Sequence, residues 1–310
     1  MRLFTLAAAL LVTTAPAQPQ GPDAPFTIAE TGQSFASLQE AVTAIGERRG
    51  TIRIAPGRYG ECAVQEAGDI TYVAQVPGKS VFDRAICEGK ATLVLRGRAA
   101  KVDGIVFMRT LVEDGNGAGI RLETGNLHVT NAMFIDGQCG ILTASDPRGT
   151  ITIERSTFAG LGKDPTGNGA HAIYVGNYGS VRVFESRFER GTGGHYVKVR
   201  APRVEIINSS FDDSLGRNTN YAIDLSNGAS GRIAGNAFEQ GPAKDNYGTI
   251  IAVAPEGAKH SSAGLLIEGN KAWLSPGFKE STTFVGNWSR DAVTVRNNDL
   301  ADRIAVMARR

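Results

Sequence analysis

The sequence is poor in several features that mark large classes of proteins. After the first residues, no apolar run approaches the ~20 residues that a membrane-spanning helix needs. No dense run of Lys or Arg is present and the net charge is only +2, so nucleic acid is not an expected partner. Aromatic residues make up 7% of the chain, whereas glycine occurs 38 times. This composition favours a turn-rich β architecture over a helical bundle.

The N-terminal residues have the three parts of a secretory signal. Arg2 supplies positive charge, Leu3–Val12 is apolar, and Ala15–Ala17 provides a cleavage site of small residues. We therefore expect residues 1–17 to be a signal peptide and residues 18–310 to form a periplasmic or secreted domain. The mature chain is expected to be monomeric and to have no membrane span. An uncleaved membrane anchor is the alternative.

A structural repeat runs through the chain. Short alternating runs lead to anchor residues that recur every 23 to 35 residues, at Phe107, Phe134, Phe158, Phe188, Phe211, Phe238, Trp273 and Leu300. Asparagines lie three residues before four of these anchors, at Asn131, Asn208, Asn270 and Asn297. Asparagine tolerates a left-handed bend, and stacked amides can bond along a column. Self-similarity at this period predicts a solenoid.

Two other β architectures are less consistent with the repeat. A sandwich would have tight Asn-Gly or Asp-Gly hairpins between strand pairs, and these are sparse. A propeller blade needs about four strands, whereas a repeat of ~27 residues has room for three short ones. We predict an all-β fold, a single-stranded parallel β-helix.

The first residues of this domain predict a cap. A short amphipathic helix is expected over Ser37–Ile45, with Ser34 or Ser37 as its N-cap, followed by a strand over Thr51–Ala55 and a turn over Pro56–Gly60. Such a helix would cover the open end of the first coil. We assign residues 26–60 to this cap, 61–300 to the coils and 301–310 to a C-terminal tail.

The cap and the coils together resemble a known superfamily. The helix followed by Ile-Arg-Ile-Ala-Pro-Gly-Arg-Tyr59, and coils of the form V-x-I-x-N-x-x-F, resemble the right-handed parallel β-helix, pectin-lyase-like superfamily over about residues 26–300. This resemblance implies right-handed coils. It does not imply one reaction, because the superfamily contains polysaccharide lyases, hydrolases, esterases, epimerases and non-catalytic adhesins. The run Gly194–Ala201, Gly-His-x-x-Lys-x-Arg-Ala, also resembles a group of exported bacterial β-helix proteins.

The three cysteines have different expected roles. Cys62 and Cys87 are 25 residues apart, which suits adjacent coils in an oxidising compartment, so we predict a disulfide between them. Cys139 lies two residues before Ile141 and shares its inward parity, so we expect a buried, inert thiol. No activating partner for a catalytic thiol can be identified.

Three strands with period-2 alternation carry a polar column. Aligning the runs Ala170–Gly176, Gly194–Ala201 and Asn220–Ser226 places Tyr174, Lys198 and Asp224 on consecutive rungs, facing outward and roughly 4.8 Å apart. Arg200 lies on the same face two residues after Lys198. These residues form either a catalytic row or an exposed salt-bridge ladder worth under ~1 kcal/mol.

Longer connections surround this column. They are Ala159–Ala170, Asp212–Asn220 and Glu239–Gly248, at equivalent positions of three coils. Insertions at equivalent positions stack on one edge of a solenoid, so we expect them to form one wall of a groove. Neutral insertion at a tolerant edge is the alternative.

Further site residues are expected near the column. His171, His195 and Tyr221 form a matched column at the strand starts, which parity directs inward, although either histidine could turn into the groove as a general base. Tyr196 and Tyr178 are expected to stack on sugar rings. The remaining expected substrate contacts are Arg217, Asn246 and Glu256.

The resemblance and the column together predict a protein that acts on an acidic polysaccharide. Removal of the proton next to a uronate carboxylate, by β-elimination or in C5 epimerisation, requires that the carboxylate be neutralised, and Arg200 suits this role. Superfamily lyases imply Lys198 as the base, but Asp224 beside it favours the ammonium form. We therefore expect Lys198 to act as an acid or neutraliser, with Tyr174 or a histidine as the base.

Two alternative functions stay open. A glycoside hydrolase would pair Asp224 with Asp212, Asp213 or Glu256 as a second carboxyl group. A non-catalytic envelope protein would bind the glycan through tyrosines alone. No cofactor is assigned, and Ca²⁺ held by Asp212, Asp213 and Asp224 is kept as a further possibility, although no compact calcium motif is present.

Overall fold

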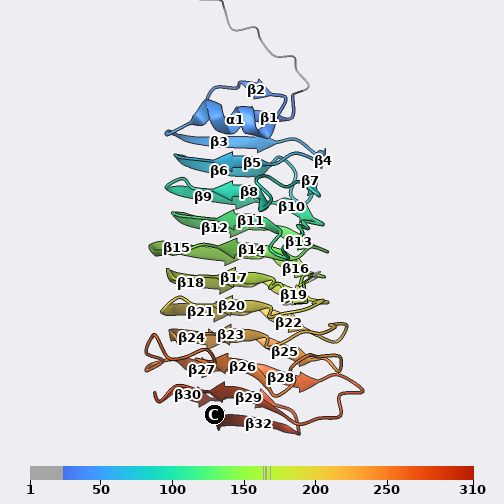
Figure 1. The fold of residues 1–310 in the computed structure, drawn as a ribbon, viewed down its shortest axis with the longest axis vertical. Coiled ribbons are helices and arrows are strands. Elements are labelled where there is room, and N and C mark those ends of the chain that lie inside the picture. Colours follow the sequence, from blue (N-terminus) through green and yellow to red (C-terminus); the bar gives the residue numbers. More distant parts are fainter. Residues whose placement is uncertain (1–23, 163, 165, 168) are drawn as a thin grey trace, which may run out of the picture.

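The described chain forms one column of stacked coils (Figure 1). A computed structural model describes residues 24–162, 164, 166–167 and 169–310. The expected signal peptide, residues 1–17, lies outside the described residues. Within the described part of the chain, no helix is long and apolar enough to cross a membrane.

Each coil contributes strands to three sheets, named A, B and C here. Sheet A contains β1 (Phe26–Ile28), β2 (Ser34–Phe35), β3 (Arg49–Ile54), β6 (Asp69–Ala74), β9 (Ala99–Asp103), β12 (Asn126–Thr130), β15 (Asp146–Glu154), β18 (Tyr178–Phe184), β21 (Arg203–Ile207), β24 (Ser230–Ala234), β27 (Leu266–Glu268) and β30 (Thr294–Arg296). Sheet B contains β4 (Gly57–Tyr59), β7 (Ser80–Asp83), β10 (Ile105–Met108), β13 (Met133–Ile135), β16 (Thr157–Ala159), β19 (Arg187–Glu189), β22 (Ser210–Asp212), β25 (Ala237–Gln240), β28 (Lys271–Leu274) and β31 (Asp299–Leu300). Sheet C contains β5 (Ala63–Gln65), β8 (Ala91–Leu95), β11 (Ala118–Leu122), β14 (Cys139–Thr143), β17 (Ile173–Val175), β20 (Val197–Val199), β23 (Ile223–Leu225), β26 (Thr249–Val253), β29 (Thr282–Asn287) and β32 (Ile304–Arg309).

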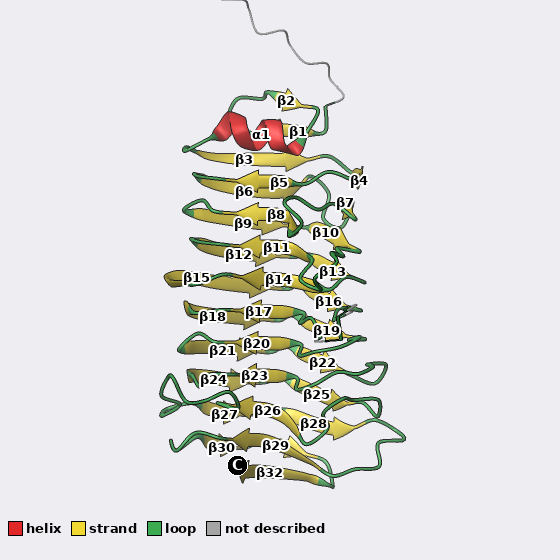
Figure 2. Ribbon diagram, in the orientation of Figure 1, coloured by secondary structure: helices red, strands yellow, loops and turns green. Residues whose placement is uncertain are grey.

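Strand pairing confirms the predicted parallel β-helix. Consecutive members of each sheet pair in parallel, one coil apart, and only β1 pairs antiparallel, with β2 and β3, among the strands described. Figure 2 shows the strands stacked along the column with a helix at its N-terminal end. Neither a sandwich nor a propeller has this strand order.

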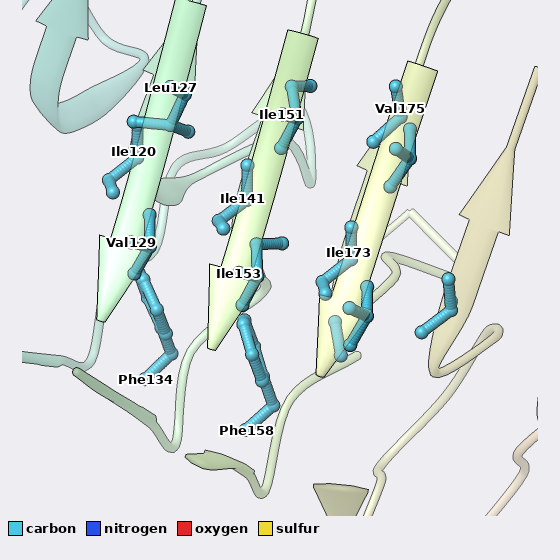
Figure 3. Packing of buried hydrophobic residues seen from close by; sticks show 14 of the residues in the cluster. Ile120, Leu127, Val129, Phe134, Ile141, Ile151, Ile153, Phe158, Ile173 and Val175 are labelled. Carbon is cyan, nitrogen blue, oxygen red and sulfur yellow. The ribbon is translucent and has the colours of Figure 1, made fainter. Parts of the chain in front are cut away.

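The core is a set of stacked apolar columns inside the coils. Phenylalanines of sheet B stack ring on ring, with centroids 4.7 Å apart for Phe134 and Phe158 and 5.0 Å apart for Phe158 and Phe188. Figure 3 shows Phe134 and Phe158 beside inward Ile and Val side chains of sheets A and C. Because each coil buries its inward side chains against its neighbours, the stack is continuous through the domain.

The anchor expected at Trp273 is wrong by one residue. Strand pairing aligns Ala272 with Phe238 and with Leu300, and the side chain of Trp273 is 40% exposed. Phe284 covers the end of the phenylalanine column instead, edge-on to Phe238 with centroids 5.7 Å apart. The sequence pattern favours the large aromatic residue Trp273 as the anchor, whereas the register of strand pairing places Ala272 inside the coil.

The asparagine column also differs in detail from the prediction. Asn131, Asn208 and Asn297 have φ near +50° as expected, but the bend of the seventh anchor is at Gly269. Asn270 lies one residue later, where its Nδ2 donates to Oδ1 of Asn298 at 2.8 Å and its Oδ1 accepts from Asn236 at 2.9 Å. The hydrogen-bonded amides of Asn236, Asn270 and Asn298 therefore lie one residue after the left-handed bends, not at the bends themselves.

The N-terminal cap has the predicted helix. α1 (Leu38–Ile45) covers the first coil (Figure 1) and buries Leu38, Ala41, Val42 and Ile45. Its N-cap is Ser37, which forms a capping box with Glu40, so the alternative cap Ser34 is wrong. The turn expected over Pro56–Gly60 is wrong in part, because Gly57–Tyr59 forms β4 and begins sheet B.

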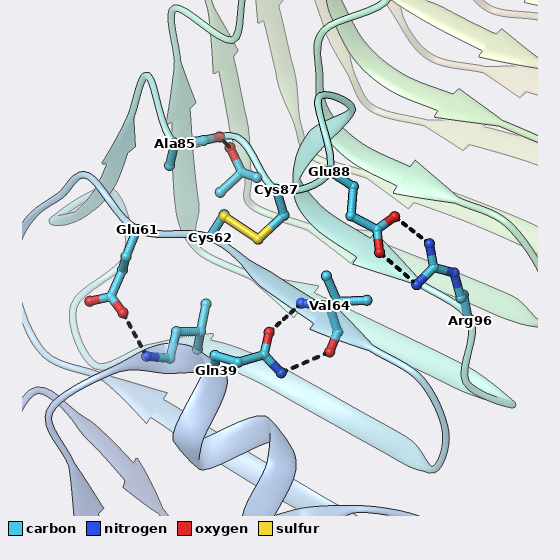
Figure 4. The surroundings of a disulfide bond; sticks show 10 residues. Gln39, Glu61, Cys62, Val64, Ala85, Cys87, Glu88 and Arg96 are labelled. Atoms are coloured by element: carbon cyan, nitrogen blue, oxygen red, sulfur yellow. Dashed lines mark hydrogen bonds and ion pairs between the residues drawn. A yellow bond between two sulfur atoms is a disulfide. The ribbon is translucent and has the colours of Figure 1, made fainter.

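The cysteines are placed as a disulfide and a buried thiol. Cys62 and Cys87 are bonded, with Cα atoms 5.5 Å apart, beside the contact of α1 with β5 (Figure 4). Cys139 is buried, and burial raises the pKa of its thiol to about 11. Its expected inward direction is wrong: both Gly140 and Ile141 bond the carbonyl of Ala172, a local irregularity that puts Cys139 outside the main core.

Candidate functional site

The expected column is present on the outer face of sheet C. Strand pairing aligns Tyr174 of β17 with Lys198 of β20, and Lys198 with Asp224 of β23. On this face Lys198 is only 6% exposed and Asp224 only 1%. The alternative of an exposed salt-bridge ladder is therefore wrong.

Four charged side chains form one connected network. Lys198 Nζ contacts Asp224 Oδ2 at 3.0 Å and Glu256 Oε1 at 2.5 Å. The other oxygen of Glu256 accepts from Arg200 Nη2. Arg200 Nε donates to the phenol oxygen of Tyr174 at 2.9 Å, and Nη1 donates to Asn227 at 3.1 Å. The two cations are thus balanced by two carboxylates.

The network fixes the charge states of its members. Burial alone would lower the pKa of Lys198, but Asp224 and Glu256 outweigh it and raise that pKa above its ordinary value. Burial tends to raise the pKa of Glu256, but its bonds to Lys198 and Arg200 bring it below the ordinary value. Burial raises the pKa of Asp224 despite Lys198. Lys198 is consequently a charged ammonium and unsuited to be a base.

Asp224 is anchored by one oxygen alone. Its Oδ2 lies 3.0 Å from Lys198 Nζ, accepts from the hydroxyl of Ser226 at 3.0 Å and lies 3.3 Å from Nε2 of His195. Its buried Oδ1 has no hydrogen-bond partner among the residues that the structure describes. The carboxylate is therefore held behind Lys198, away from solvent.

The histidine column points outward, so its expected inward direction is wrong. Ala172 and Ile173 both face the core, as do Tyr196 and Val197, because the coil turns a corner at the start of each strand. Two consecutive inward residues break the period-2 alternation. His195, one residue before Tyr196, is therefore directed to the outer face, where the histidines line a cavity.

A groove follows the outer face of sheet C along several coils. A cavity of about 380 Å³, the cation cavity, is lined by Tyr174, Lys198, Arg200 and His171. A cavity of about 320 Å³, the histidine cavity, is lined by His171 and His195 and shares His171 with the first. A third cavity of about 340 Å³ shares Tyr174 with the cation cavity and is also lined by Arg121. Shared lining residues make the three one continuous groove.

The three long connections line the histidine cavity as expected. The first contributes Gly162 and Asp164, the second Asn218 and Asn220, and the third Asp245. Gly194 begins the motif that carries His195 and Lys198, and its φ is +59°. A Cβ at Gly194 would lie 1.9 Å from the carbonyl oxygen of Ala170, so only glycine allows the two coils to approach here.

Several expected substrate contacts lie elsewhere. Tyr178 and Tyr196 are buried inside the coils, so their expected stacking on sugar rings is wrong. Arg217 lines a different cavity, with Arg190 and Leu215. Asn246 donates to the hydroxyl of Tyr221 at 3.0 Å and so steadies the end of the histidine column. Of the five expected substrate-binding residues, Glu256 belongs to the network of Lys198 and Arg200.

Asp213 is committed to a second buried network. Lys244 Nζ lies 3.0 Å from its Oδ2, and Tyr196 and Thr219 donate to its Oδ1 at 2.7 and 2.9 Å. Asp212 lies on sheet B, where its Oδ1 accepts from Ser214, rather than on sheet C with Asp224. Asp212, Asp213 and Asp224 therefore do not converge as a Ca²⁺ site, and no metal-binding cluster occurs among the described residues.

Sequence reasoning missed two groove residues. Asn227 holds Arg200 from the turn after β23, and Arg121 extends the groove toward the N-terminus. Arg121 is in fact an earlier member of the same outward column, since it pairs with Leu142 and Leu142 pairs with Tyr174. Extending the alternation by two coils would have found it.

Comparisons with known proteins agree with the fold. The sequence model described as "Right handed beta helix region" matches residues 118–300. The solved pectate lyase Pel9A is 15% identical, with a TM-score of 0.52, over 89% of this chain and 74% of that one. The Geobacillus virus E2 ORF18 protein is 12% identical, with a TM-score of 0.53, over 84% of this chain and 57% of that one.

A pectin methylesterase from Aspergillus niger is also similar, at 15% identity and a TM-score of 0.45, over 84% of this chain and 89% of that one. No curated protein matches the chain. At these identities the pectate lyase and the viral protein speak for the fold alone. The family match covers more than half of the sequence and lies within the predicted coils. The chain belongs to the right-handed β-helix family.

Proposed function

We propose that this chain is an exported, carbohydrate-active β-helix protein that acts on an acidic polysaccharide by β-elimination or C5 epimerisation. The groove supports a linear ligand, because it runs along the coil axis across consecutive strands of sheet C. Its middle carries two cations, Lys198 and Arg200, which suit a polymer with repeated carboxylates.

Glu256 is the observation that carries the proposal. Its carboxylate lies between Lys198 and Arg200, and its side chain is 40% exposed. Asp224, by contrast, holds Lys198 from the buried side. The network thus already binds a carboxylate on its exposed side. A uronate carboxylate that replaced that of Glu256 would meet the same two cations.

The two reactions share their first step. A base removes the proton from C5, next to the carboxylate, and the charge that develops on the carboxylate oxygens is stabilised by Lys198 and Arg200. In elimination the C4–O bond then breaks, a C4=C5 double bond forms and the departing oxygen takes up a proton. In epimerisation a proton returns to C5 from the opposite face. Tyr174 is our candidate proton carrier, because Arg200 holds its phenol oxygen and it lines the cation cavity.

Lys198→Ala and Arg200→Ala test the proposal on polygalacturonate and alginate. Wild-type protein is expected to produce an unsaturated uronate, seen in the near-ultraviolet, or a changed C5 proton spectrum. Both variants are expected to lose turnover while remaining folded. Lys101→Ala and Arg182→Ala, at exposed positions of sheet A, are the matched controls and should retain activity. Wild-type turnover in both groove variants would overturn the proposal.

Hydrolysis is a second candidate, favoured by the spacing of two carboxylates. Asp224 and Glu256 contact the same ammonium, at 3.0 and 2.5 Å. Their nearest oxygens are thus closer than the ~6.5 Å minimum of inverting glycosidases and compatible with the ~5–5.5 Å of retaining ones. Asp224 is nevertheless enclosed behind Lys198, so hydrolysis ranks second. New reducing ends without unsaturated product would support it, and ligand binding without either product would indicate a glycan-binding protein.

A further inference from the structure

The ring nitrogens of the histidine column have assigned roles. The backbone N–H of His195 donates to Nδ1 of His171 at 3.0 Å, and the backbone N–H of Tyr221 donates to Nδ1 of His195 at 3.1 Å. A nitrogen that accepts an N–H bond carries no proton. Each neutral ring therefore carries its proton on Nε2, and the coil backbone repeats this arrangement from rung to rung.

The direction of Nε2 follows from the same repeat. The rings of His171 and His195 stack 4.9 Å apart at 28°, and Nε2 of His195 lies 3.3 Å from Asp224 Oδ2. Lys198 pairs with Asp224 and therefore has the equivalent position on the preceding coil. Nε2–H of His171 is therefore directed to the side of Lys198. His195 meets an acceptor there, whereas His171 meets another donor.

His171 is thus a donor without an internal acceptor. Among the described residues, no acceptor is found for the Nε2–H of His171. Its ring lines both the cation cavity and the histidine cavity. Burial, then the charge of Lys198, lowers the pKa of His171 to about 3, so the ring stays neutral and keeps this tautomer. A neutral Nε2–H cannot accept a proton, and Nδ1 is occupied. The general-base role considered for His171 does not fit this geometry.

We propose that Nε2–H of His171 and the ammonium of Lys198 jointly bind one carboxylate oxygen of the ligand in the cation cavity. This inference rests on the proposed function, whose acidic polysaccharide supplies that oxygen. His171 then selects for an acceptor group at this subsite. His195 has a different role, because its proton is directed to Asp224.

Two substitutions separate the two nitrogens. In His171→Asn the side-chain oxygen takes the place of Nδ1 and still accepts the N–H of His195, but the Nε2 donor is lost. In His171→Gln the amide nitrogen lies near the position of Nε2, so a donor is retained. His128→Asn is the matched control, since His128 lies on sheet A away from the groove.

Binding of trigalacturonate is measured for each variant by calorimetry. His171→Asn is expected to bind about tenfold more weakly than wild type, the loss of one hydrogen bond to a charged group, with an unchanged melting temperature. His171→Gln should recover part of the affinity, and His128→Asn should bind normally. Equal affinity of His171→Asn and wild type would overturn the inference while leaving the proposed function intact.

Nitrogen-15 NMR of the wild-type protein gives a readout that does not depend on folding of a variant. His171 and His195 are expected to show the Nε2–H tautomer at neutral pH. Titration with acetate, a bare carboxylate, should shift the Nε2 signal of His171. A tautomer protonated on Nδ1, or an unshifted signal at saturating trigalacturonate, would refute the inference. A shift by acetate, in a protein that binds no acidic oligosaccharide, would support the carboxylate subsite and refute the proposed function.

Discussion

Replacing Lys198 by methionine tests whether the buried carboxylate of Asp224 depends on it. Asp224 is 1% exposed and contacts Lys198 at 3.0 Å. Removing one partner of a buried pair typically costs about 3–5 kcal/mol, because the other charge is left uncompensated. Ser226 and His195 still face Asp224 in the variant. We therefore expect the lower end, about 3 kcal/mol less free energy of unfolding at pH 7.

A double-mutant cycle with Asp224→Asn isolates the interaction. In Asp224→Asn alone, Lys198 keeps Glu256 as its partner, so we expect a loss of only about 1–2 kcal/mol. The double variant removes both charges of the Lys198–Asp224 pair, and its loss should fall short of the sum of the single losses by about 2 kcal/mol. Urea unfolding followed by two spectroscopic probes measures these values, since coincident curves show that the coils unfold together.

The loss of unfolding free energy in Lys198→Met, relative to wild type, should depend on pH. Burial raises the pKa of Asp224, and losing Lys198 removes the main opposing effect, so the folded-state pKa rises further. A carboxyl group with a raised folded-state pKa stabilises the fold below its unfolded pKa of about 4, and this contribution disappears as the pH rises through the folded-state value. The loss of stability should therefore be small near pH 4 and should grow as the pH rises toward 7. A pH-independent deficit, or a variant within about 0.5 kcal/mol of wild type at pH 7, would refute the reasoning.

Three further predictions follow from the other contacts. Glu256→Gln should bind trigalacturonate more tightly in calorimetry, because the competing carboxylate is gone, and should change stability by under about 1 kcal/mol since the side chain is half-exposed; weaker binding would show that Glu256 itself contacts the ligand. Replacing Cys62 and Cys87 by serine should lower the free energy of unfolding by about 3 kcal/mol, because the 25-residue loop is no longer closed in the unfolded chain; unchanged urea unfolding would contradict this. Lys244→Met should cost about 3–5 kcal/mol in the same assay by stranding buried Asp213, and a neutral result would show that Tyr196 and Thr219 suffice to hold that carboxylate.

Local patterns were sufficient for much of the fold. The capping box of Ser37 and Glu40 and the apolar face of Leu38–Ile45 lie within one short segment, so the helix could be read from it. The phenylalanine anchors recur because every coil must fill the same interior, and their period predicted the stack. The error at Trp273 arose because its large ring suits an interior position, while pairing with Phe238 is set by the neighbouring coil.

The candidate site was predictable only where strands are regular. Tyr174, Lys198 and Asp224 are mid-strand residues, so alternation placed them correctly on one face. His195 lies at a corner of the coil. The next two residues, Tyr196 and Val197, both face inward, so the alternation of inward and outward residues fails there. The sequence indicates Glu256 as a groove residue, but its bond to Lys198, 58 residues away in the chain, follows from no local pattern.

The sequence by itself determined the parallel coils, the helical cap, the disulfide partners and the polar column, because each depends on short-range alternation or on a fixed repeat. Tertiary structure decided which side chains meet between coils: Glu256 across Lys198 and Arg200, Asp213 with Lys244, and the outward histidines with backbone amides on the next rung. Those contacts depend on the paths of the loops and on the geometry of the corners. Both are set by the conformations of many residues together. The charge balance of the groove is therefore a property of the folded coil stack rather than of any one motif.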